Sequence, residues 1–355
     1  MLPAIAHHCD FGWHTIKMQS VFPLGGFHMP SCLIVQPIHP AGLALLEQSG
    51  IEAVLSDPGA MVAQAPGVAA VITRNAGFTA EAMRAAPDLA VVSVHGTGYD
   101  RVAVETATGL GILVVNTPEA NVLSVAEHTL ALTFALAKGV VSGDRATRAG
   151  DDGFKYRARM IELAGATFGI VGFGLIGRET ARLAAAIGMR VVGWSPSGRS
   201  ADLQAAGVEP MASLEALVAE SDVVSLHLRL SPSSRHLIDR RMLARMKPGA
   251  FLVNTARGAL VDEDALCDAL AAGDLAGAGL DVFADEPLPT NSRLREHENI
   301  VLTPHVAGST EQALQRMARL AASQVVDVLA GRRPPHIVNP AAWPGRAAAF
   351  TAGKP

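Results

Sequence analysis

The sequence predicts an α/β protein made of two doubly wound parallel-sheet domains, with the second domain inserted into a split first one. Short apolar runs alternate with helical patterns along most of the chain, which is typical of parallel sheets joined by crossover helices. The alternation stops over residues 150–164 and then starts again. A last helical pattern follows the second series, so we expect the chain to return to its first unit.

The first series of elements begins at Cys32. The apolar run CLIVQPI ends at Pro40, and a helical pattern closed by Gly50 follows it. The further expected strands are 70–74, 89–96 and 112–116, and the further expected helices are 79–87 and 104–111. Residues 121–149 then form the longest helical pattern, with Asn121 as its cap and no proline inside.

The second series predicts a six-stranded doubly wound sheet. Its expected strands are 168–172, 190–194, 222–228, 250–254, 277–281 and 299–303. Its expected helices are 176–188, 213–219, RMLARM and DEDALCDALAAG. A last helix over 309–331 and the extended segment PPHIVNP complete the chain.

The simplest architecture is two α/β units with the second inserted into the first, because the chain has to return to the first unit. We expect residues 1–30 to be a loosely ordered extension and residues 341–355 to be a C-terminal tail.

Composition limits the class of protein. With 355 residues, 49% of them apolar, the chain can bury a large core, and a net charge of -4 without a basic block argues against nucleic-acid binding. No apolar run reaches the roughly 18 residues that cross a bilayer. The first thirty residues make a poor signal peptide, so we expect a cytoplasmic protein without membrane contact.

Neither the cysteines nor the histidines predict a metal site. The three cysteines lie far apart, as expected for small apolar residues in a reducing compartment. The N-terminal histidines match no ligand spacing. These residues are Cys9, Cys32, Cys267, His7, His8, His14 and His28.

A glycine-rich turn predicts dinucleotide binding. Gly172, Gly174 and Gly177 form G-x-G-x-x-G between an apolar strand and a helix, the context that a Rossmann-like fold requires. The glycines allow a tight turn, close approach of a pyrophosphate and close helix packing, and the helix N-terminus favours phosphate. A purely structural turn is the alternative.

The next strand ends on Ser195, where an acid often binds the adenosine ribose. An acid would repel the 2′-phosphate of NADP, and serine removes that repulsion. Arg199 is either a partner for this phosphate or a solvated loop charge. A serine can also bind an unmodified ribose, so the pattern predicts use of NADP or NAD with NADPH modestly preferred.

Three later strand ends carry an arginine, a carboxylate and a histidine. Arg257 lies in NTARG, Asp281 and Glu286 lie in GLDVFADEP, and His305 lies in LTPHVAG. An open α/β sheet places its ligands at such ends, so together they predict a substrate clamp and a proton relay. Taken singly, the arginine fits a surface ion pair, the glutamate fits a turn and the histidine fits a strand cap.

From about residue 32 to residue 340 the chain resembles the D-isomer-specific 2-hydroxyacid dehydrogenases. The motifs that carry this resemblance are HGTGYD, NTPEANVLSVAEHTLAL, GIVGFGLIG, NTARGALVDEDAL, GLDVFADEPLP and NIVLTPHVAGST. The resemblance implies a split catalytic domain of residues 31–121 and 308–340 and an inserted NAD(P)-binding domain of residues 122–307. It also implies a homodimer joined through the inserted domain. It also implies hydride transfer between NAD(P)H and a small 2-keto acid.

The resemblance implies a role for each catalytic residue. Arg257 would hold the substrate carboxylate and polarise the keto oxygen, and His305 would protonate that oxygen. Glu286 would orient His305 and favour its charged form. Formate dehydrogenases, which resemble this pattern, carry glutamine in place of Glu286, so formate is disfavoured.

The remaining contacts follow from the same resemblance. Backbone N–H groups around His95, Gly96, Thr97 and Gly98 would bind the other face of the substrate carboxylate, and Arg257 and His305 would also contact the substrate. Asp281, with backbone near Ala256, would orient the nicotinamide amide. The expected cofactor-binding residues are Gly172, Phe173, Gly174, Leu175, Ile176, Gly177, Ser195, Pro196, Arg199, His227, Thr255, Ala256, Arg257, Asp281, His305 and Gly308.

The sequence does not decide between several substrates. Glyoxylate and hydroxypyruvate lead, and 3-phosphoglycerate is the nearest rival because HGTGYD resembles that branch. Arg74 either meets the distal end of such a substrate or forms a surface ion pair. Arg229, where the family commonly has proline, is either a cation near the cofactor or a solvent-facing side chain. A dinucleotide-sensing, corepressor-like binding protein is the alternative of another class.

Overall fold

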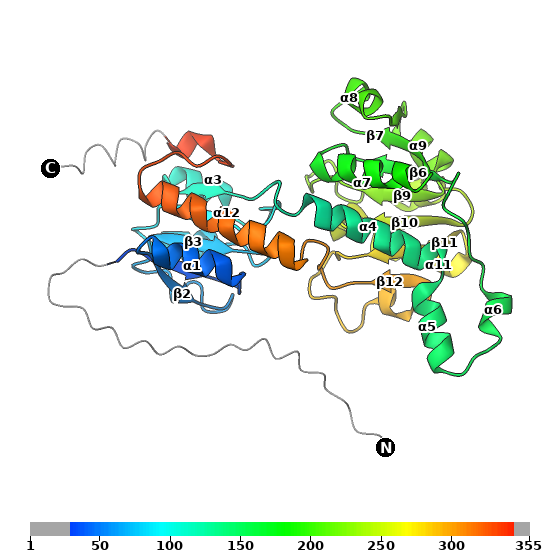
Figure 1. Ribbon diagram of the computed structural model, residues 1–355, viewed down its shortest axis with the longest axis horizontal. Helices are drawn as coiled ribbons and strands as arrows, with labels where there is room; N and C mark the ends of the chain where they lie inside the picture. Colours follow the sequence, from blue (N-terminus) through cyan, green and yellow to red (C-terminus); the bar gives the residue numbers. More distant parts are fainter. Residues whose placement is uncertain (1–28, 344–355) are drawn as a thin grey trace, which may run out of the picture.

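The computed structural model describes residues 29–343 and consists of two lobes (Figure 1). One lobe contains a five-stranded sheet and the other a seven-stranded sheet, and every pair of strands within them is parallel. The chain passes from the first lobe to the second and returns in α12 (Glu311–Leu329), which packs on the first sheet. The predicted fold class is confirmed.

The five-stranded sheet has the order β2-β1-β3-β4-β5. Its strands are β1 (Ser31–Ile34), β2 (Glu52–Leu55), β3 (Ala70–Thr73), β4 (Val91–Val94) and β5 (Leu113–Val115). Strands β3, β4 and β5 are wholly buried, as expected of a parallel sheet covered on both faces. The sequence reading missed β2, a half-exposed edge strand.

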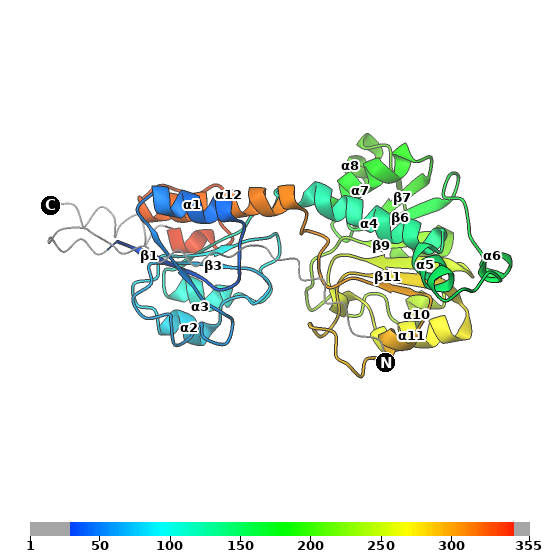
Figure 2. The ribbon, with the colours of Figure 1, turned by 60° about the horizontal axis from the view of Figure 1, so that its bottom comes forward.

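Helices cover both faces of this sheet (Figure 2). Helices α1 (Pro40–Gln48) and α12 pack together on one face, and α2 (Ala80–Arg84) and α3 (Val104–Gly109) lie on the other. The predicted extended segment PPHIVNP is confirmed, because the Val338 N–H donates to the Val114 carbonyl at 2.8 Å along β5.

The seven-stranded sheet has the order β12-β11-β10-β9-β6-β7-β8. Its strands are β6 (Thr167–Val171), β7 (Arg190–Trp194), β8 (Glu209–Pro210), β9 (Val223–Leu226), β10 (Ala250–Asn254), β11 (Leu275–Leu280) and β12 (Ile300–Leu302). The prediction of six strands was wrong by one. Strand β8 has two residues at the sheet edge and too little apolar pattern to be recognised.

Two apolar cores lie on opposite faces of the larger sheet. Helices α4 (Val122–Ala137) and α7 (Leu175–Ala186) pack on one face. Helices α9 (Leu214–Glu220), α10 (Arg240–Leu243) and α11 (Glu263–Ala272) pack on the other. The chain order reverses between β6 and β9, so ligands are expected beyond the carboxyl ends of these two strands.

The single long helix predicted over 121–149 was wrong. Gly139 adopts φ +58° and separates α4 from α5 (Val140–Arg148). Such a left-handed residue ends a helix without any proline. Asn121 begins α4, but its side chain makes no cap and accepts a hydrogen bond from Thr97 Oγ1 at 3.0 Å. Helix α6 (Phe154–Arg157) follows in the connecting segment.

Most of the predicted extension and tail lies outside residues 29–343. The N-terminal histidines and Cys9 also lie outside. Ala342, which we assigned to the tail, is buried and belongs to the core under α1 and α12. Within the described part, no helix combines the length and apolar character needed to cross a membrane, and no group of three side chains could hold a metal ion.

Candidate active site

A cavity of about 490 Å³ lies between the two lobes. Loops after β3 and β4 line it from the first lobe, and loops after β6, β9, β10, β11 and β12 line it from the second. Both sheets therefore present their carboxyl ends to one space, as open α/β sheets do for their ligands.

The glycine turn forms one wall of the cavity. Gly172 has φ +99°, and a Cβ on it would stand 2.6 Å from the His227 carbonyl oxygen. A Cβ on Gly177 would stand 2.2 Å from the Gly172 carbonyl oxygen, so the helix packs closely there. Gly174 lines the cavity and has open space where a Cβ would project. The backbone at the start of α7 is therefore accessible to a pyrophosphate.

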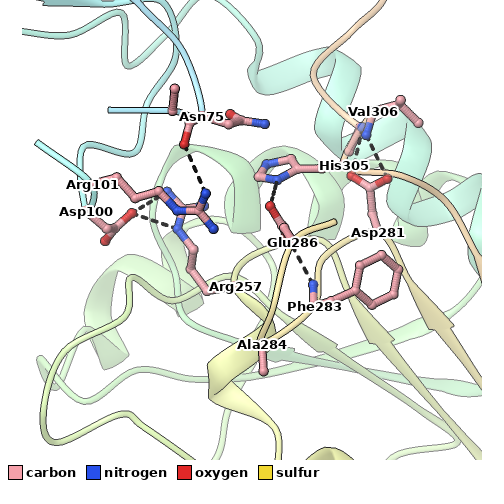
Figure 3. Close-up of polar contacts among 12 residues, drawn as sticks. Asn75, Asp100, Arg101, Arg257, Asp281, Phe283, Ala284, Glu286, His305 and Val306 are labelled. Atoms are coloured by element: carbon pink, nitrogen blue, oxygen red, sulfur yellow. Dashed lines mark hydrogen bonds and ion pairs between the residues drawn. The ribbon is translucent and has the colours of Figure 1, made fainter. Parts of the chain in front are cut away.

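His305 and Glu286 form a hydrogen-bonded pair beside this cavity (Figure 3). His305 Nδ1 lies 2.8 Å from Glu286 Oε2, and Glu286 Oε1 accepts the Phe283 N–H at 3.2 Å. His305 lines the cavity, whereas Glu286 stands behind it and is only 18% exposed at its side chain. The ring is thus fixed through Nδ1, which leaves Nε2 for a ligand.

The electrostatics favour an ionised carboxylate in this pair. Burial raises the pKa of Glu286, but the hydrogen bond and charge of His305 lower it more, so the net pKa lies below its usual value. Arg101 adds a smaller lowering from the first lobe. A carboxylate that stays charged stabilises the protonated imidazole, which is the form that can donate a proton.

Asp281 fixes the loop that carries His305. Its carboxylate is buried and accepts hydrogen bonds from Thr303 Oγ1 at 2.6 Å and from the N–H groups of Val306 and Ala307 at 2.9 and 2.8 Å. The Asp281 carbonyl accepts the His305 N–H at 2.8 Å, and His305 has φ +52°. The loop is therefore held in a conformation that a side-chain-bearing residue seldom adopts.

Arg257 reaches the cavity from the turn after β10. Asn254 shapes this turn, because its side chain donates to the Arg257 carbonyl at 2.8 Å and accepts the Ala256 N–H at 3.0 Å. Gly258 allows the turn to pass the backbone of Phe283, which a Cβ would meet at 1.8 Å. The guanidinium is 30% exposed.

An ion pair joins Arg257 to the other lobe. Its Nε and Nη2 both donate to Asp100 Oδ2 at 2.7 Å, and its Nη1 donates to the Ala256 carbonyl at 2.7 Å (Figure 3). Arg229 makes a second bridge, since its Nη1 donates to Tyr99 Oη at 3.2 Å and its guanidinium lies over that ring. Arg229 lines the cavity and is also exposed to solvent, so both interpretations of this side chain stay open.

Gly98 leaves the space that Arg257 occupies. A Cβ on Gly98 would stand 1.4 Å from Arg257 Nη2, and Gly98 has no left-handed φ that would itself oppose alanine. We expect Gly98→Ala to displace the guanidinium and lower kcat/KM by about 10–100-fold, because one ångström of misplacement can cost about 10²-fold. Steady-state kinetics on any accepted keto acid measures this.

Gly109→Ala is the matched control for Gly98→Ala. Gly109 is a helical glycine with open space where a Cβ would project. Its kcat/KM should stay at the wild-type value. Equal losses in the two variants would show that alanine acts through folding rather than through Arg257.

The loop over His95 to Gly98 uses part of its backbone internally. The His95 N–H donates to the Thr73 carbonyl at 2.8 Å, and the Gly96 N–H donates to the Val94 carbonyl at 2.9 Å. Among the described residues no partner is found for the N–H groups of Thr97 and Gly98. Of the four N–H groups predicted to bind a carboxylate, two are therefore used within the protein and these two are not.

Arg74 lies in the same cavity wall as His95. Arg74 Nη1 donates to the Pro37 carbonyl at 3.0 Å, and the side chain has no acidic partner within residues 29–343, so the predicted surface ion pair is absent there. Burial lowers the pKa of Arg74. Burial and then the charge of Arg74 lower the pKa of His95 to about 4, so this ring is neutral.

His227 and Thr255 line the cavity from the second lobe. His227 Nε2 lies 2.9 Å from Ser225 Oγ, and burial lowers the pKa of His227 to about 3. Thr255 Oγ1 lies 2.9 Å from Thr129 Oγ1 on α4. Both are held by the second lobe alone, and neither contributes a charge to the cavity at neutral pH.

Most of the predicted site residues meet at this cavity. Its lining includes His95, Gly96, Thr97, Gly98, Gly174, Leu175, Ile176, Arg199, His227, Thr255, Ala256, Arg257, Asp281, His305 and Gly308. Six predicted residues are not in the lining, namely Gly172, Phe173, Gly177, Ser195, Pro196 and Glu286. Ser195 lies on the adjoining loop, where its Oγ is 3.0 Å from Ser197 Oγ.

Sequence reasoning missed several residues of the site. Asp100 and Tyr99 could have been considered as site residues, because they end the HGTGYD motif. Arg178 follows the third glycine and lines the cavity. No sequence motif pointed to Arg101, whose charge lowers the pKa of Glu286.

The chain is similar to known dehydrogenases. The model of the D-isomer specific 2-hydroxyacid dehydrogenase NAD-binding domain matches residues 130–307. Glyoxylate reductase of Thermofilum pendens is 40% identical over 264 residues, which cover 73% of this chain and 78% of that protein. D-3-phosphoglycerate dehydrogenase of Mycobacterium tuberculosis is 40% identical over 315 residues, which cover 88% of this chain but 59% of that protein.

A solved structure extends the comparison to a bound cofactor. An acyclic imino acid reductase in complex with NADPH and D-Arg has a TM-score of 0.76 and 25% identity, over 87% of this chain and 99% of that one. Fold, site and relatives together define an oxidoreductase that uses a nicotinamide cofactor. The chain belongs to the D-isomer-specific 2-hydroxyacid dehydrogenase family, as its motifs predicted.

Proposed function

We propose that this dehydrogenase reduces a small 2-keto acid of the glyoxylate or hydroxypyruvate class. The observation that carries the proposal is the His305–Glu286 pair beside Arg257, at a cavity lined also by the glycine turn. A relative at 40% identity is a glyoxylate reductase, which favours the same class.

Each side chain has a role that follows from its position. Arg257 binds the substrate carboxylate and polarises the keto oxygen, and the free N–H groups of Thr97 and Gly98 bind the same carboxylate. His305 gives its proton to the keto oxygen from Nε2, while Glu286 stabilises the charged ring. A bound NAD(P)H supplies the hydride. In the reverse direction His305 takes the proton back.

The nicotinamide contacts fit the same arrangement. The carboxylate of Asp281 is engaged by its own loop, so its role is to hold that loop against the cofactor. Ala256 and Thr255 line the cavity with their turn. The other predicted cofactor residues, from Gly172 to Gly177 with His227 and Gly308, would contact the cofactor mainly through backbone.

A substrate panel tests the proposed function. Glyoxylate, hydroxypyruvate, pyruvate and 3-phosphohydroxypyruvate are each supplied with NADPH and with NADH, and the loss of absorbance at the reduced nicotinamide is followed. Turnover of the first two supports the proposal. No turnover of any keto acid would defeat it and favour a dinucleotide-sensing, corepressor-like binding protein.

Oxidation of 3-phosphoglycerate is a second candidate function. The supporting observations are the relative in Mycobacterium tuberculosis and the unpaired cation of Arg74 in the cavity wall. A phosphate usually binds more than one cation, and the chain spans 59% of that relative. A higher kcat/KM for 3-phosphohydroxypyruvate than for hydroxypyruvate would favour this candidate.

NADPH is the cofactor that we expect to be preferred, by a modest factor. Ser195 leaves no carboxylate at the end of β7 to repel the 2′-phosphate, and Arg199 lines the cavity nearby. The imino acid reductase, solved with NADPH, shares the fold. A kcat/KM ratio strongly in favour of NADH would contradict this, and Ser195→Asp should shift the ratio toward NADH.

The homodimer is proposed from exposed apolar side chains on α5, on α6 and in the segment that follows α6. Neither helix buries a residue, and Val140, Tyr156 and Met160 are 57%, 83% and 48% exposed. Figure 1 shows both helices projecting from the larger lobe. Such a patch on a helical arm favours contact with another chain, and a second copy is the simplest partner.

Replacing Val140 with lysine should shift the protein from dimer to monomer. A charge placed in an apolar interface must be desolvated, which disfavours association. Light scattering after size exclusion, over a tenfold range of concentration, measures the shift. Leu110→Lys is the control, since Leu110 is 49% exposed on the other lobe and should leave the mass unchanged. A monomeric wild type would refute the dimer.

Domain limits and location remain part of the proposal. We propose a split catalytic domain of residues 31–121 and 308–340, an NAD(P)-binding domain of residues 122–307, and a cytoplasmic location. Support for the location comes from Cys32 and Cys267, which are free and buried. Cell fractionation tests it, and recovery outside the cytoplasm would contradict it.

A further inference from the structure

Two arginines that line the cavity near the loop after β7 share one carboxylate. Arg178 Nη2 donates to Asp202 Oδ2 at 2.9 Å, and Arg199 Nη1 lies 3.9 Å from the same oxygen. Both arginines line the cavity. Asp202 belongs to the short helix α8 (Ser200–Ala205), which directly follows the loop after β7. The sequence reading weighed only Arg199.

Arg178 is held over the glycine turn. It is the residue after Gly177, and its guanidinium lies 4.7 Å from the centre of the Phe173 ring, which is itself buried. A planar cation stacked on an aromatic face keeps its N–H groups in a defined plane. The side chain therefore projects from α7 toward the loop that holds Ser195 and Arg199.

The ion pairs of Asp202 with these arginines are weak, so another anion can replace the Asp202 carboxylate. The side chains of Arg178, Arg199 and Asp202 are 38%, 46% and 49% exposed. Exposed ion pairs contribute little to stability because water and salt screen them. A phosphate carries more charge than a carboxylate and offers three acceptor oxygens, so it competes well for two guanidinium groups.

We propose that Arg178 and Arg199 together bind the 2′-phosphate of NADPH and that Asp202 sets the cofactor preference by competing for them. This inference rests on the proposed use of NAD(P)H. With NADH, Asp202 keeps its place and neutralises the arginines, so no cation is left without a partner. With NADPH, the phosphate displaces Asp202 and meets its negative charge nearby. The preference for NADPH is therefore modest because Asp202 opposes it.

The test compares three single variants by the ratio of Kd for NADH to Kd for NADPH. Binding is followed by quenching of protein fluorescence at low and at moderate ionic strength, so no turnover is required. Arg178→Gln should lower the ratio by about tenfold, the effect of one charge-assisted hydrogen bond. Asp202→Asn should raise it by about threefold or more, with a smaller rise at higher salt.

Arg182→Gln is the matched control. Arg182 lies on the same helix, is 62% exposed and pairs within that helix with Glu179. The ratio should stay at its wild-type value in this variant. An unchanged ratio in Arg178→Gln, or a lower ratio in Asp202→Asn, would overturn the inference.

The two proposals fail in distinguishable ways. Loss of all keto acid reduction in the wild type would refute the proposed function but leave the binding ratios interpretable. If the wild type reduces glyoxylate but neither Arg178→Gln nor Asp202→Asn changes the Kd ratio, only the phosphate site is refuted.

Discussion

Replacing His305 with alanine should lower kcat for keto acid reduction by about 10²–10⁴-fold, the range of general acid catalysis. The ring is held by Glu286 at 2.8 Å and by a loop fixed through Asp281, so it presents Nε2 to the cavity in one orientation. Alanine removes the proton donor. Two other histidines of the cavity wall, His95 and His227, cannot replace it at neutral pH, because burial lowers their pKa to about 4 and about 3. Single-turnover measurements with bound NADPH isolate the chemical step.

Cofactor binding separates this interpretation from a structural one. His305 lines the cavity from the loop after β12, whereas the glycine turn follows β6. The Kd for NADPH should therefore change by about twofold or less in His305→Ala. An equal loss of cofactor binding and turnover would undermine the role of His305 as proton donor.

Glu286→Gln tests the second member of the pair. Glutamine keeps the shape and one acceptor oxygen, but its NH2 group cannot accept a second hydrogen bond and it carries no charge. Because the pKa of Glu286 lies below its usual value, the wild-type carboxylate is ionised through the mildly acidic range and stabilises the charged ring. The variant should have a lower kcat for reduction, with a smaller change in KM, because the ring loses the charge that stabilises its proton-donating form. An unchanged kcat would show that the charge of Glu286 plays no part in the proton transfer.

The sequence predicted the elements whose pattern is local. Buried parallel strands such as β6 and β10 read as continuous apolar runs, and the glycines of the turn mark one backbone geometry. Strands β2 and β8 were missed because an edge strand needs little apolar pattern. The break at Gly139 was missed because a single glycine is tolerated in many helices, and its left-handed φ is visible only in the structure.

The site was predictable to the extent that strand ends define it. Parallel strands place their carboxyl ends at one edge, so Arg257, Glu286 and His305 could be grouped without coordinates. The contacts that cross between elements could not be predicted in this way. The ion pair of Arg257 with Asp100 depends on how the two lobes face each other, and the sharing of Asp202 depends on the path of one loop.

Replacing Arg257 with lysine should lower kcat/KM by about 10²–10³-fold, although the positive charge is kept. The guanidinium uses Nε and Nη2 on Asp100 and Nη1 on the Ala256 carbonyl, so three of its nitrogens already fix its plane. The remaining N–H groups can then meet a substrate carboxylate in a defined direction. A lysine has one ammonium group and cannot hold Asp100 and a substrate in the same geometry.

Asp100→Asn provides the comparison for Arg257→Lys. Asparagine keeps the shape and an acceptor oxygen but removes the charge that anchors the guanidinium, so we expect a smaller loss of about tenfold, mostly in KM. If Asp100 instead competed with the substrate for Arg257, the KM of this variant would fall below that of the wild type. A loss in Asp100→Asn as large as that in Arg257→Lys would mean that the contact between the lobes, rather than the carboxylate clamp, limits the reaction.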